Sequence, residues 1–361
     1  TLFRSMVIVA FVVVQLLISG GKVSNSLSGQ LVPICCYIAL AVSLNLTVGI
    51  LGELSLGHAG FMSVGAFSGV VAAISLQDTV SSGPVRLIIA VIVGGILAAV
   101  AGVLVGIPVL RLQGDYLAIV TLAFGEIIKN LLNNIYLGKD SSGLHFSMKD
   151  TASLGLDDTG VVIINGPMGA VGIAKLSTFI AGFVLVLIVL TITLNLTRSR
   201  SGRAIMAIRD NRIAAESVGI NVTKYKLMAF VTSAAMAGMA GAVYAMNYSS
   251  IVPKKFDFNT SILILVFVVL GGMGNIRGSI IAATILTILP EALRSLNDYR
   301  MLIYAIVLIL VMLATNNPTL KNIIGNITGK IAFWQKTVDD GTADGKMSAA
   351  GDMKDGGGSH D

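Results

Sequence analysis

Charged residues are scarce in this chain. Asp, Glu, Lys and Arg make up 12% of the 361 residues, apolar residues make up 55%, and the mean hydropathy is +0.86. In a soluble domain about a quarter of the residues are charged. The composition therefore excludes a soluble globular protein of this length and predicts a polytopic membrane protein.

Cysteine and histidine are also nearly absent. The two cysteines, Cys35 and Cys36, are adjacent within an apolar run, where neighbouring residues rarely form a structural disulfide. The chain has three histidines, and one of them lies in the polar C-terminal tail. We therefore expect the cysteines to be ordinary core residues and expect no metal site.

The chain lacks the sequences that would supply energy or bind nucleic acid. No stretch matches G-x-x-x-x-G-K-[ST], the loop that cradles nucleotide phosphates. Ionisable residues within the apolar runs are too few to indicate a proton relay. The basic residues do not interleave with aromatic ones, so a net charge of +6 does not indicate nucleic acid. We expect no cofactor in this chain, and we expect a partner to supply the energy for any driven transport.

Long apolar runs are what the sequence does contain. With about 20 residues for each membrane helix, we expect an all-α fold of about ten transmembrane helices. They are expected near residues 3–19, 31–50, 59–76, 86–109, 115–132, 178–197, 227–248, 260–273, 278–294 and 300–315. The first run is long enough for a retained membrane helix rather than a cleaved signal.

The basic segment 198–226 orients these helices. Loops rich in lysine and arginine stay in the cytoplasm, so this segment and both chain termini are expected there. The aspartate-rich segment 133–177 then forms an extracytoplasmic connection between a first transmembrane half, 1–132, and a second half, 178–315. The remaining residues, 316–361, form a cytoplasmic tail that is expected to be disordered from about residue 335, because it has almost no apolar residues.

Two halves of five helices each favour an inverted repeat. The sequence echo found between them does not support that arrangement. It joins LGELS at 51–55 to LGGMG at 270–274, and both stretches are expected on the cytoplasmic side, whereas inverted equivalents belong on opposite sides.

Polar groups interrupt the apolar pattern at LGELSLGHAG, residues 51–60. Irregular backbone at membrane depth is tolerated where protein covers it or where it lines a wet cavity, so Glu53, Ser55 and His58 are candidates for a path or gate. The alternative is an ordinary cytoplasmic turn with solvated side chains. LGGMGNIRGS, residues 270–279, is interpreted as a second glycine-rich break of the same kind.

The fifth expected helix carries an acidic residue, Glu126. Its spacing from Lys129 allows an ion pair on one helix face, with Asn130 one turn away. An acid within a membrane helix is a functional candidate, whereas an acid paired at the outer interface is structural. A further alternative is an intramembrane enzyme that uses Glu53 and His58, or Glu126, as acid and base.

Two patterns of small residues stand out. Glycine and alanine recur along 94–106 and 234–242, at spacings that let helices approach closely. They favour either plain helix packing or a sliding interface. In the basic segment, the run AAESVG at 214–219 predicts a short surface helix that ends at a glycine, which is suited to docking.

Four longer stretches together resemble a known family. They are LNLTVGILGELSLGHAGFMSVGAF (44–67), RLQGDYLAIVTLAFGEI (111–127), SGRAIMAIRDNRIAAESVGI (201–220) and VVLGGMGNIRGSIIAA (268–283). In order and spacing they are similar to the M-type permease subunit of branched-chain amino acid ABC importers, over about residues 31–314. Related permeases carry urea, short amides or other amino acids, so these remain alternative substrates, and a self-sufficient secondary transporter is the less favoured class.

The resemblance implies a type II importer-like fold in the bacterial cytoplasmic (inner) membrane and a transporter subunit rather than an enzyme. The implied partners, besides the lipid bilayer, are a homologous H-type permease in a heterodimer, two cytoplasmic ATP-binding subunits that bind ATP and Mg, and an extracytoplasmic substrate-binding protein.

The resemblance also assigns roles to residues. The order Ala-Ala-Glu-x-x-Gly departs from the E-A-A-x-x-x-G order of other importer classes, so the side chains that make the contact stay open. The expected ATPase-coupling residues are Gly202, Arg203, Arg209, Asp210, Arg212, Ala214, Ala215, Glu216 and Gly219. The candidates for the translocation path are Asn45, Glu53, Ser55, His58, Thr121, Glu126 and Asn130.

Overall fold

The computed structural model of the chain describes residues 25–110, 115–140, 143–157 and 160–293, together with Gln15 and five positions between 302 and 309. Every element below belongs to the first of the two compact units into which the chain divides, residues 1–300. Apart from those isolated positions, the spans expected at 3–19 and 300–315 lie outside the described residues. The tail expected at 316–361 lies outside them as well.

The other expected spans each correspond to a helix. These helices are α2 (Asn25–Asn45), α3 (His58–Ser75), α4 (Gly83–Val109), α5 (Asp115–Asn133), α6 (Phe179–Arg198), α9 (Val222–Ala245), α10 (Phe258–Gly271) and α11 (Ile276–Ala292). Among the described residues, six helices are long and apolar enough to cross a membrane by length and composition. The chain is therefore a mostly helical, multi-pass membrane protein.

A small sheet corrects the expectation of an all-α fold. Its strands are β1 (Tyr136–Lys139), β2 (Leu144–Ser147), β3 (Val161–Asn165), β4 (Ala170–Val171) and β5 (Ser250–Ile251). They pair antiparallel in the order β2-β1-β3-β4-β5. The strands are two to five residues long, too short for a periodic pattern to predict them. Strands β1 to β4 lie in a segment rich in Gly, Ser and Asp, and β5 follows α9. Short 3-10 turns, η2 (Ala152–Leu154) and η3 (Gly166–Met168), accompany them.

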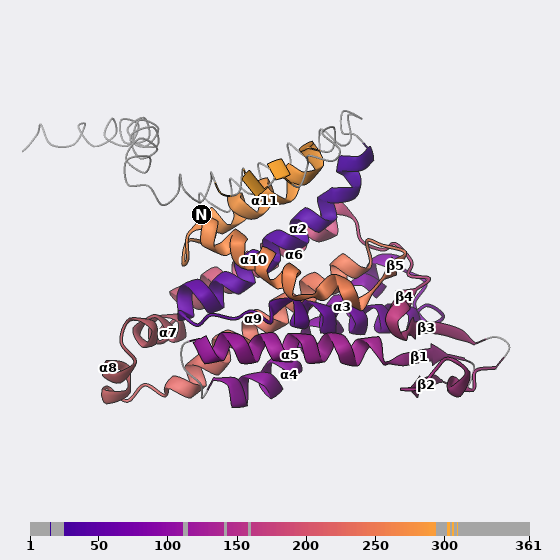
Figure 1. Cartoon of the computed structure of the whole chain (residues 1–361), viewed down its shortest axis with the longest axis horizontal. Helices are drawn as coiled ribbons and strands as arrows, with labels where there is room; N and C mark the ends of the chain where they lie inside the picture. The colour runs from indigo at the N-terminus through magenta and orange to yellow at the C-terminus, as the bar shows by residue number, and fades with distance from the viewer. Residues whose placement is uncertain are drawn as a thin grey trace, which may run out of the picture. The chain divides into compact units, whose positions relative to one another are not determined.

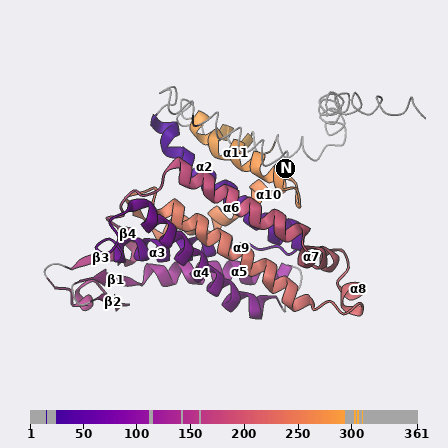
Figure 2. The same cartoon turned by 180° about the vertical axis from the view of Figure 1, so that it is seen from behind.

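Helix α9 lies at the centre of the described bundle (Figures 1 and 2). It packs on α4 and α3, and close contacts between small residues let it do so. A Cβ atom at Gly102 would meet Ala234, and one at Gly238 would meet Ala98. The small-residue patterns thus serve helix packing. Because α9 belongs to the second half of the sequence and α3 and α4 to the first, the two halves interleave.

The two glycine-rich stretches adopt different structures. Helix α2 continues into a π-turn, η1 (Leu46–Leu51), and residues 52–57 then run as irregular chain before α3 begins. The second stretch is a tight turn between α10 and α11 instead of a second break of the same kind. It is short because Gly272 and Gly274 adopt positive φ angles of 89° and 83°, which other residues avoid.

The basic segment folds into two short helices, α7 (Arg200–Asp210) and α8 (Arg212–Ser217). Side-chain caps start each helix: Ser199 accepts from the Gly202 N–H at the start of α7, and Asn211 accepts from the Ala214 N–H at the start of α8. In Figure 1 these helices lie at one end of the bundle and the strands at the other. We call these the α8 end and the sheet end.

Candidate functional site

Helix α8 presents apolar side chains to the surroundings. Ile213 is 79% exposed and Val218, directly after the helix, is 75% exposed. On the opposite side of the helix, Ala215 is buried against Ile208 of α7 and Val222 of α9. One side of α8 therefore anchors it to the chain, while the other offers a small apolar surface.

Charged residues surround this apolar surface. Arg212 Nε donates to Glu216 Oε1 at 3.1 Å, one turn apart along α8. Ala214 and Gly219 are exposed beside them, and Gly219 ends the helix with a φ of 84°. These four expected coupling residues thus gather on one exposed surface.

The remaining expected coupling residues lie on α7 and on the inner side of α8. Gly202 is buried at the start of α7, where a Cβ atom would collide with the carbonyls of Leu196 and Thr197. Arg203 reaches back to the Arg198 carbonyl at 3.4 Å. Arg209 and Asp210 form an ion pair at 3.4 Å. Of the expected set, Ala215 is a core contact instead of a surface one.

The polar side chains of the segment after α2 are covered by protein. Ser55 and His58 are both buried, and His58 Nε2 lies 2.7 Å from Ser43 Oγ. Glu53 forms an ion pair with Lys226 of α9. Of the two interpretations of LGELSLGHAG, the solvated turn is therefore wrong for these side chains. Ser55 Oγ has no hydrogen-bond partner among the described residues.

Asn45 is fully buried at the end of α2. Its Nδ2 donates to Ser279 Oγ at 3.0 Å, and its Oδ1 accepts from the Gly274 N–H at 2.8 Å. Both polar ends of this side chain therefore hold the turn between α10 and α11.

The polar residues of α5 form mostly local contacts. Glu126 and Lys129 form the ion pair that their spacing allowed. Thr121 Oγ1 donates to the Ala118 carbonyl at 2.9 Å and accepts from the Leu56 N–H at 3.1 Å. Asn130 is exposed. In the described structure Glu53, His58 and Glu126 each have a separate partner, so the acid–base pair that an intramembrane enzyme requires is not formed.

Two helices have their first turns in contact and run in opposite directions. The Ala59 N–H, in the first turn of α3, donates to Ser261 Oγ in the first turn of α10 at 3.2 Å. The end of α3 lies at the sheet, where Lys139 Nζ donates to the Ser75 carbonyl at 3.0 Å. The end of α10 leads into the turn held by Asn45, near α7. Broken membrane helices of this kind surround substrate sites in several transporter folds.

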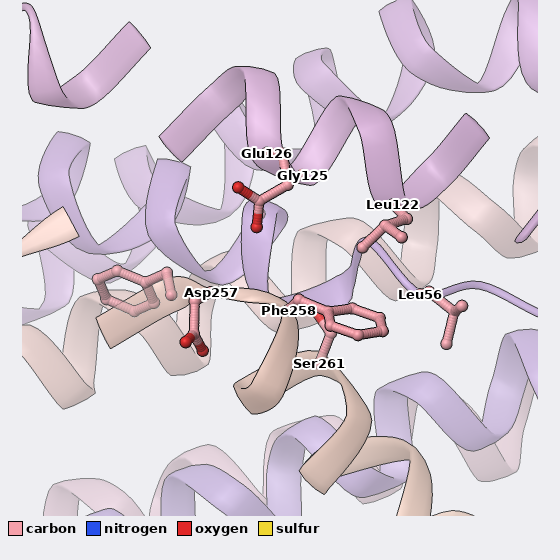
Figure 3. Close-up of a pocket in the computed structure, with 9 residues that line it drawn as sticks. Leu56, Leu122, Gly125, Glu126, Asp257, Phe258 and Ser261 are labelled. Carbon is pink, nitrogen blue, oxygen red and sulfur yellow. The ribbon is translucent and has the colours of Figure 1, made fainter. Parts of the chain in front are cut away.

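A small, partly open cavity lies where these two helices begin. In Figure 3 the Glu126 side chain projects from α5 toward the segment that carries Asp257 and Phe258. Asp257 also caps α10, since its Oδ1 accepts from the Thr260 N–H at 3.0 Å. The lining residues are Leu56, Gly60, Leu122, Gly125, Glu126, Phe256, Asp257, Phe258 and Ser261.

Three residues that shape the starts of α3 and α10 and the segment before α3 are missing from the predicted site residues. Asp257 caps α10 and Ser261 lies in its first turn. The order Asp-x-x-Thr at 257–260 is a helix-start signal that could have identified Asp257. Lys226 was counted among the basic loop residues, whereas the structure buries it beside Glu53. No local pattern identifies that pair, because its members are 173 residues apart in the chain.

Comparison with known proteins gives matches over most of the chain. Residues 26–312 match the family described as branched-chain amino acid transport system / permease component. The chain is 36% identical, over 291 residues, to the high-affinity branched-chain amino acid transport system permease protein LivM of Escherichia coli (strain K12). That match covers 77% of this chain and 66% of LivM.

Shorter parts of the chain are similar to other permeases. The chain is 31% identical over 123 residues to the ribose import permease protein RbsC of Haemophilus influenzae, which is 32% of this chain and 38% of RbsC. It is 32% identical over 112 residues to the probable branched-chain amino acid transport permease protein LivH of Methanocaldococcus jannaschii, which is 30% of this chain and 34% of LivH. No solved structure matches.

Proposed function

Because the chain belongs to the family of branched-chain amino acid transport permease components, we propose that it is the transmembrane permease subunit of an ATP-driven ABC importer. Its substrates are branched-chain amino acids, which it passes into the cytoplasm by alternating access. Permeation of urea, short amides or other amino acids is the alternative. The chain itself is a transporter subunit without enzymatic activity.

The exposed apolar surface of α8 carries this proposal. Large apolar side chains that stay exposed on a short, well-capped helix indicate a surface that another protein covers. Helix α8 lies in the basic segment, which the lysine and arginine bias places in the cytoplasm. A short, rigid helix on the cytoplasmic face gives an ATPase subunit an element through which it can move the membrane helices. This chain needs such an element because it has no ATP-binding loop of its own.

The partners follow from the family. A homologous H-type permease pairs with this chain, two cytoplasmic subunits bind ATP and Mg, and an extracytoplasmic binding protein delivers the substrate. In this arrangement the sheet between the halves faces outward in the bacterial inner membrane, and both chain termini face the cytoplasm. The opposed helices α3 and α10 support an inverted repeat of two five-helix halves.

A zwitterionic amino acid with an apolar side chain needs few charges along its route. Glu126 and Asp257 line the cavity where α3 and α10 begin, and Thr121 lies close by on α5. We expect this region to face the path. Asn45, Ser55 and His58 lie deeper in the protein and support the path without lining it.

Reconstitution of the full complex in liposomes tests the proposal. With the ATPase subunits, the partner permease and the binding protein present, leucine uptake should require ATP. Ile213→Asp places a charge in the apolar contact of α8, and uptake should fall at least about tenfold, as for truncation of an interface anchor. Thr223→Asp, on the exposed first turn of α9, adds the same charge outside α8 and should leave uptake close to that of the wild type.

Two results would contradict the proposal. One is leucine uptake by liposomes that hold this chain without any ATPase subunit, which would indicate a secondary transporter. The other is wild-type binding of the ATPase subunits by Ile213→Asp, which would place the docking surface elsewhere.

A further inference from the structure

Arg209 bonds to the membrane domain, although its side chain is 45% exposed. Its Nη1 donates to the carbonyl oxygen of Gly49 in η1 at 2.8 Å. The stem of the same side chain lies against Gly52, where a Cβ atom would lie 2.6 Å from Arg209 Cγ. The last turn of α7 is thereby attached to the end of α2.

A second attachment lies on the other side of α8. Lys226, at the start of α9, forms an ion pair with Glu53, and the two side chains are only 6% and 14% exposed. Arg209 precedes α8 and Lys226 follows it, yet both bind residues 49–53. Any displacement of the segment that carries α8 therefore acts on residues 49–53 through two contacts, one before α8 in the chain and one after it.

Residues 49–53 are in turn joined to the turn between α10 and α11. Gly49 packs directly on the backbone of Gly274, and Arg209 Nη1 lies near the same glycine. Asn45, one turn before Gly49, accepts from the Gly274 N–H and donates to Ser279. The end of α2 and the α10–α11 turn are therefore joined in one group of contacts.

We propose that Arg209 is a positioning residue that transmits motion of α8 to the start of α3 and to the α10–α11 turn. The inference rests on the proposed ATP-driven import, and it replaces the expectation that Arg209 contacts the ATPase directly. Segment 52–57 leads from this attachment to the first turn of α3, where Ala59 is bonded to Ser261 of α10. The pair Lys226–Glu53 is the second attachment, which keeps the segment from pivoting about Arg209.

The experiment compares variants of Arg209 in the reconstituted complex. Leucine uptake and ATP hydrolysis are measured together, and the readout is the amount of leucine imported for each ATP hydrolysed. Arg209→Met keeps the stem over Gly52 and removes the donor to Gly49, so this ratio should fall at least about fivefold, the lower range for coupling between sites. Arg209→Lys keeps a cationic donor and should regain most of the ratio.

Lys224→Met is the matched control, because it removes one positive charge from the exposed first turn of α9. It should keep the wild-type ratio. A wild-type ratio in Arg209→Met would overturn the inference. So would a parallel loss of uptake and hydrolysis in Arg209→Met, because that result would place Arg209 in assembly and not in transmission.

Amide hydrogen exchange gives a readout that does not need transport. On addition of Mg-ATP to the purified complex, exchange in residues 49–57 should change in the wild type and should change much less in Arg209→Met. Equal changes in both proteins would overturn the inference. If the wild-type complex hydrolysed ATP without importing leucine, the proposed function would fail, whereas the exchange result would still decide the role of Arg209.

Discussion

The two glycine-rich stretches, 51–60 and 270–279, look alike in sequence and differ in structure. The first leads from η1 to α3, which begins beside the middle of α5. The second reverses the chain between α10 and α11, two helices that pack on each other. Glycine allows close approach in both stretches, to α5 at Gly57 in the first and between α10 and α11 at Gly271 and Gly278 in the second. Positive φ angles also occur in both, at Gly52 and at Gly272 and Gly274.

Hydrogen bonding of the backbone separates the two stretches. In the first, the Leu56 and Ala59 N–H groups donate to side chains of α5 and α10. In the second, the Gly272 N–H donates to the Val269 carbonyl at 3.1 Å and the Asn275 N–H donates to the Gly272 carbonyl at 2.9 Å. The first stretch therefore depends on bonds to distant elements, whereas the second combines local bonds with the two bonds that Asn45 forms to Gly274 and Ser279. Substitutions should separate these two kinds of dependence.

The largest effect is expected for Lys226→Met in the first stretch. The substitution leaves the Glu53 carboxylate buried without its partner, which costs about 3–5 kcal/mol of stability. Thermal unfolding in detergent should show a loss of that size. The double variant Glu53→Gln with Lys226→Met removes both charges and should recover most of it. If Lys226→Met alone unfolded like the wild type, the buried pair would not hold the first stretch in place.

A smaller loss is expected for Gly57→Ala. A Cβ atom there would collide with the backbone carbonyl of Thr121, and overpacking of this kind costs about 1–3 kcal/mol. Gly29→Ala is the control, because no atom lies within 4 Å of the new methyl group. It should leave stability unchanged or raise it by up to about 1 kcal/mol, since Gly29 lies within α2. Equal stability of the two variants would mean that α5 moves aside at no cost.

The same contrast explains what the sequence predicts and what it does not. Apolar length places the membrane helices well: α4 was expected at 86–109 and spans 83–109, and α5 was expected at 115–132 and spans 115–133. The Glu126–Lys129 pair and the surface helix α8 also depend only on neighbours within a turn or two, so local patterns predict them.

Contacts between distant segments could not be predicted in this way. Asn45 and Ser279 are 234 residues apart in the chain, and nothing in either local sequence points to the other. The same holds for Arg209, whose neighbours in sequence suggest a surface role and whose side chain bonds to Gly49, 160 residues away. Strand β5 pairs with β4 across α6 to α9, so the sheet likewise depends on a contact that the sequence does not display.

The smallest effect is expected for Asn275→Ala in the second stretch. Asn275 caps α11 by accepting from the Gly278 N–H at 3.3 Å, and loss of such a cap costs about 1 kcal/mol. Asn275→Ser keeps an acceptor at the same position and should stay within a few tenths of a kcal/mol of the wild type. Thermal unfolding of the two variants, measured beside Lys226→Met, tests whether the α10–α11 turn is locally stabilised. A loss for Asn275→Ala as large as that for Lys226→Met would mean that Asn275 does more for the turn than cap α11, because removal of one exposed cap cannot account for it.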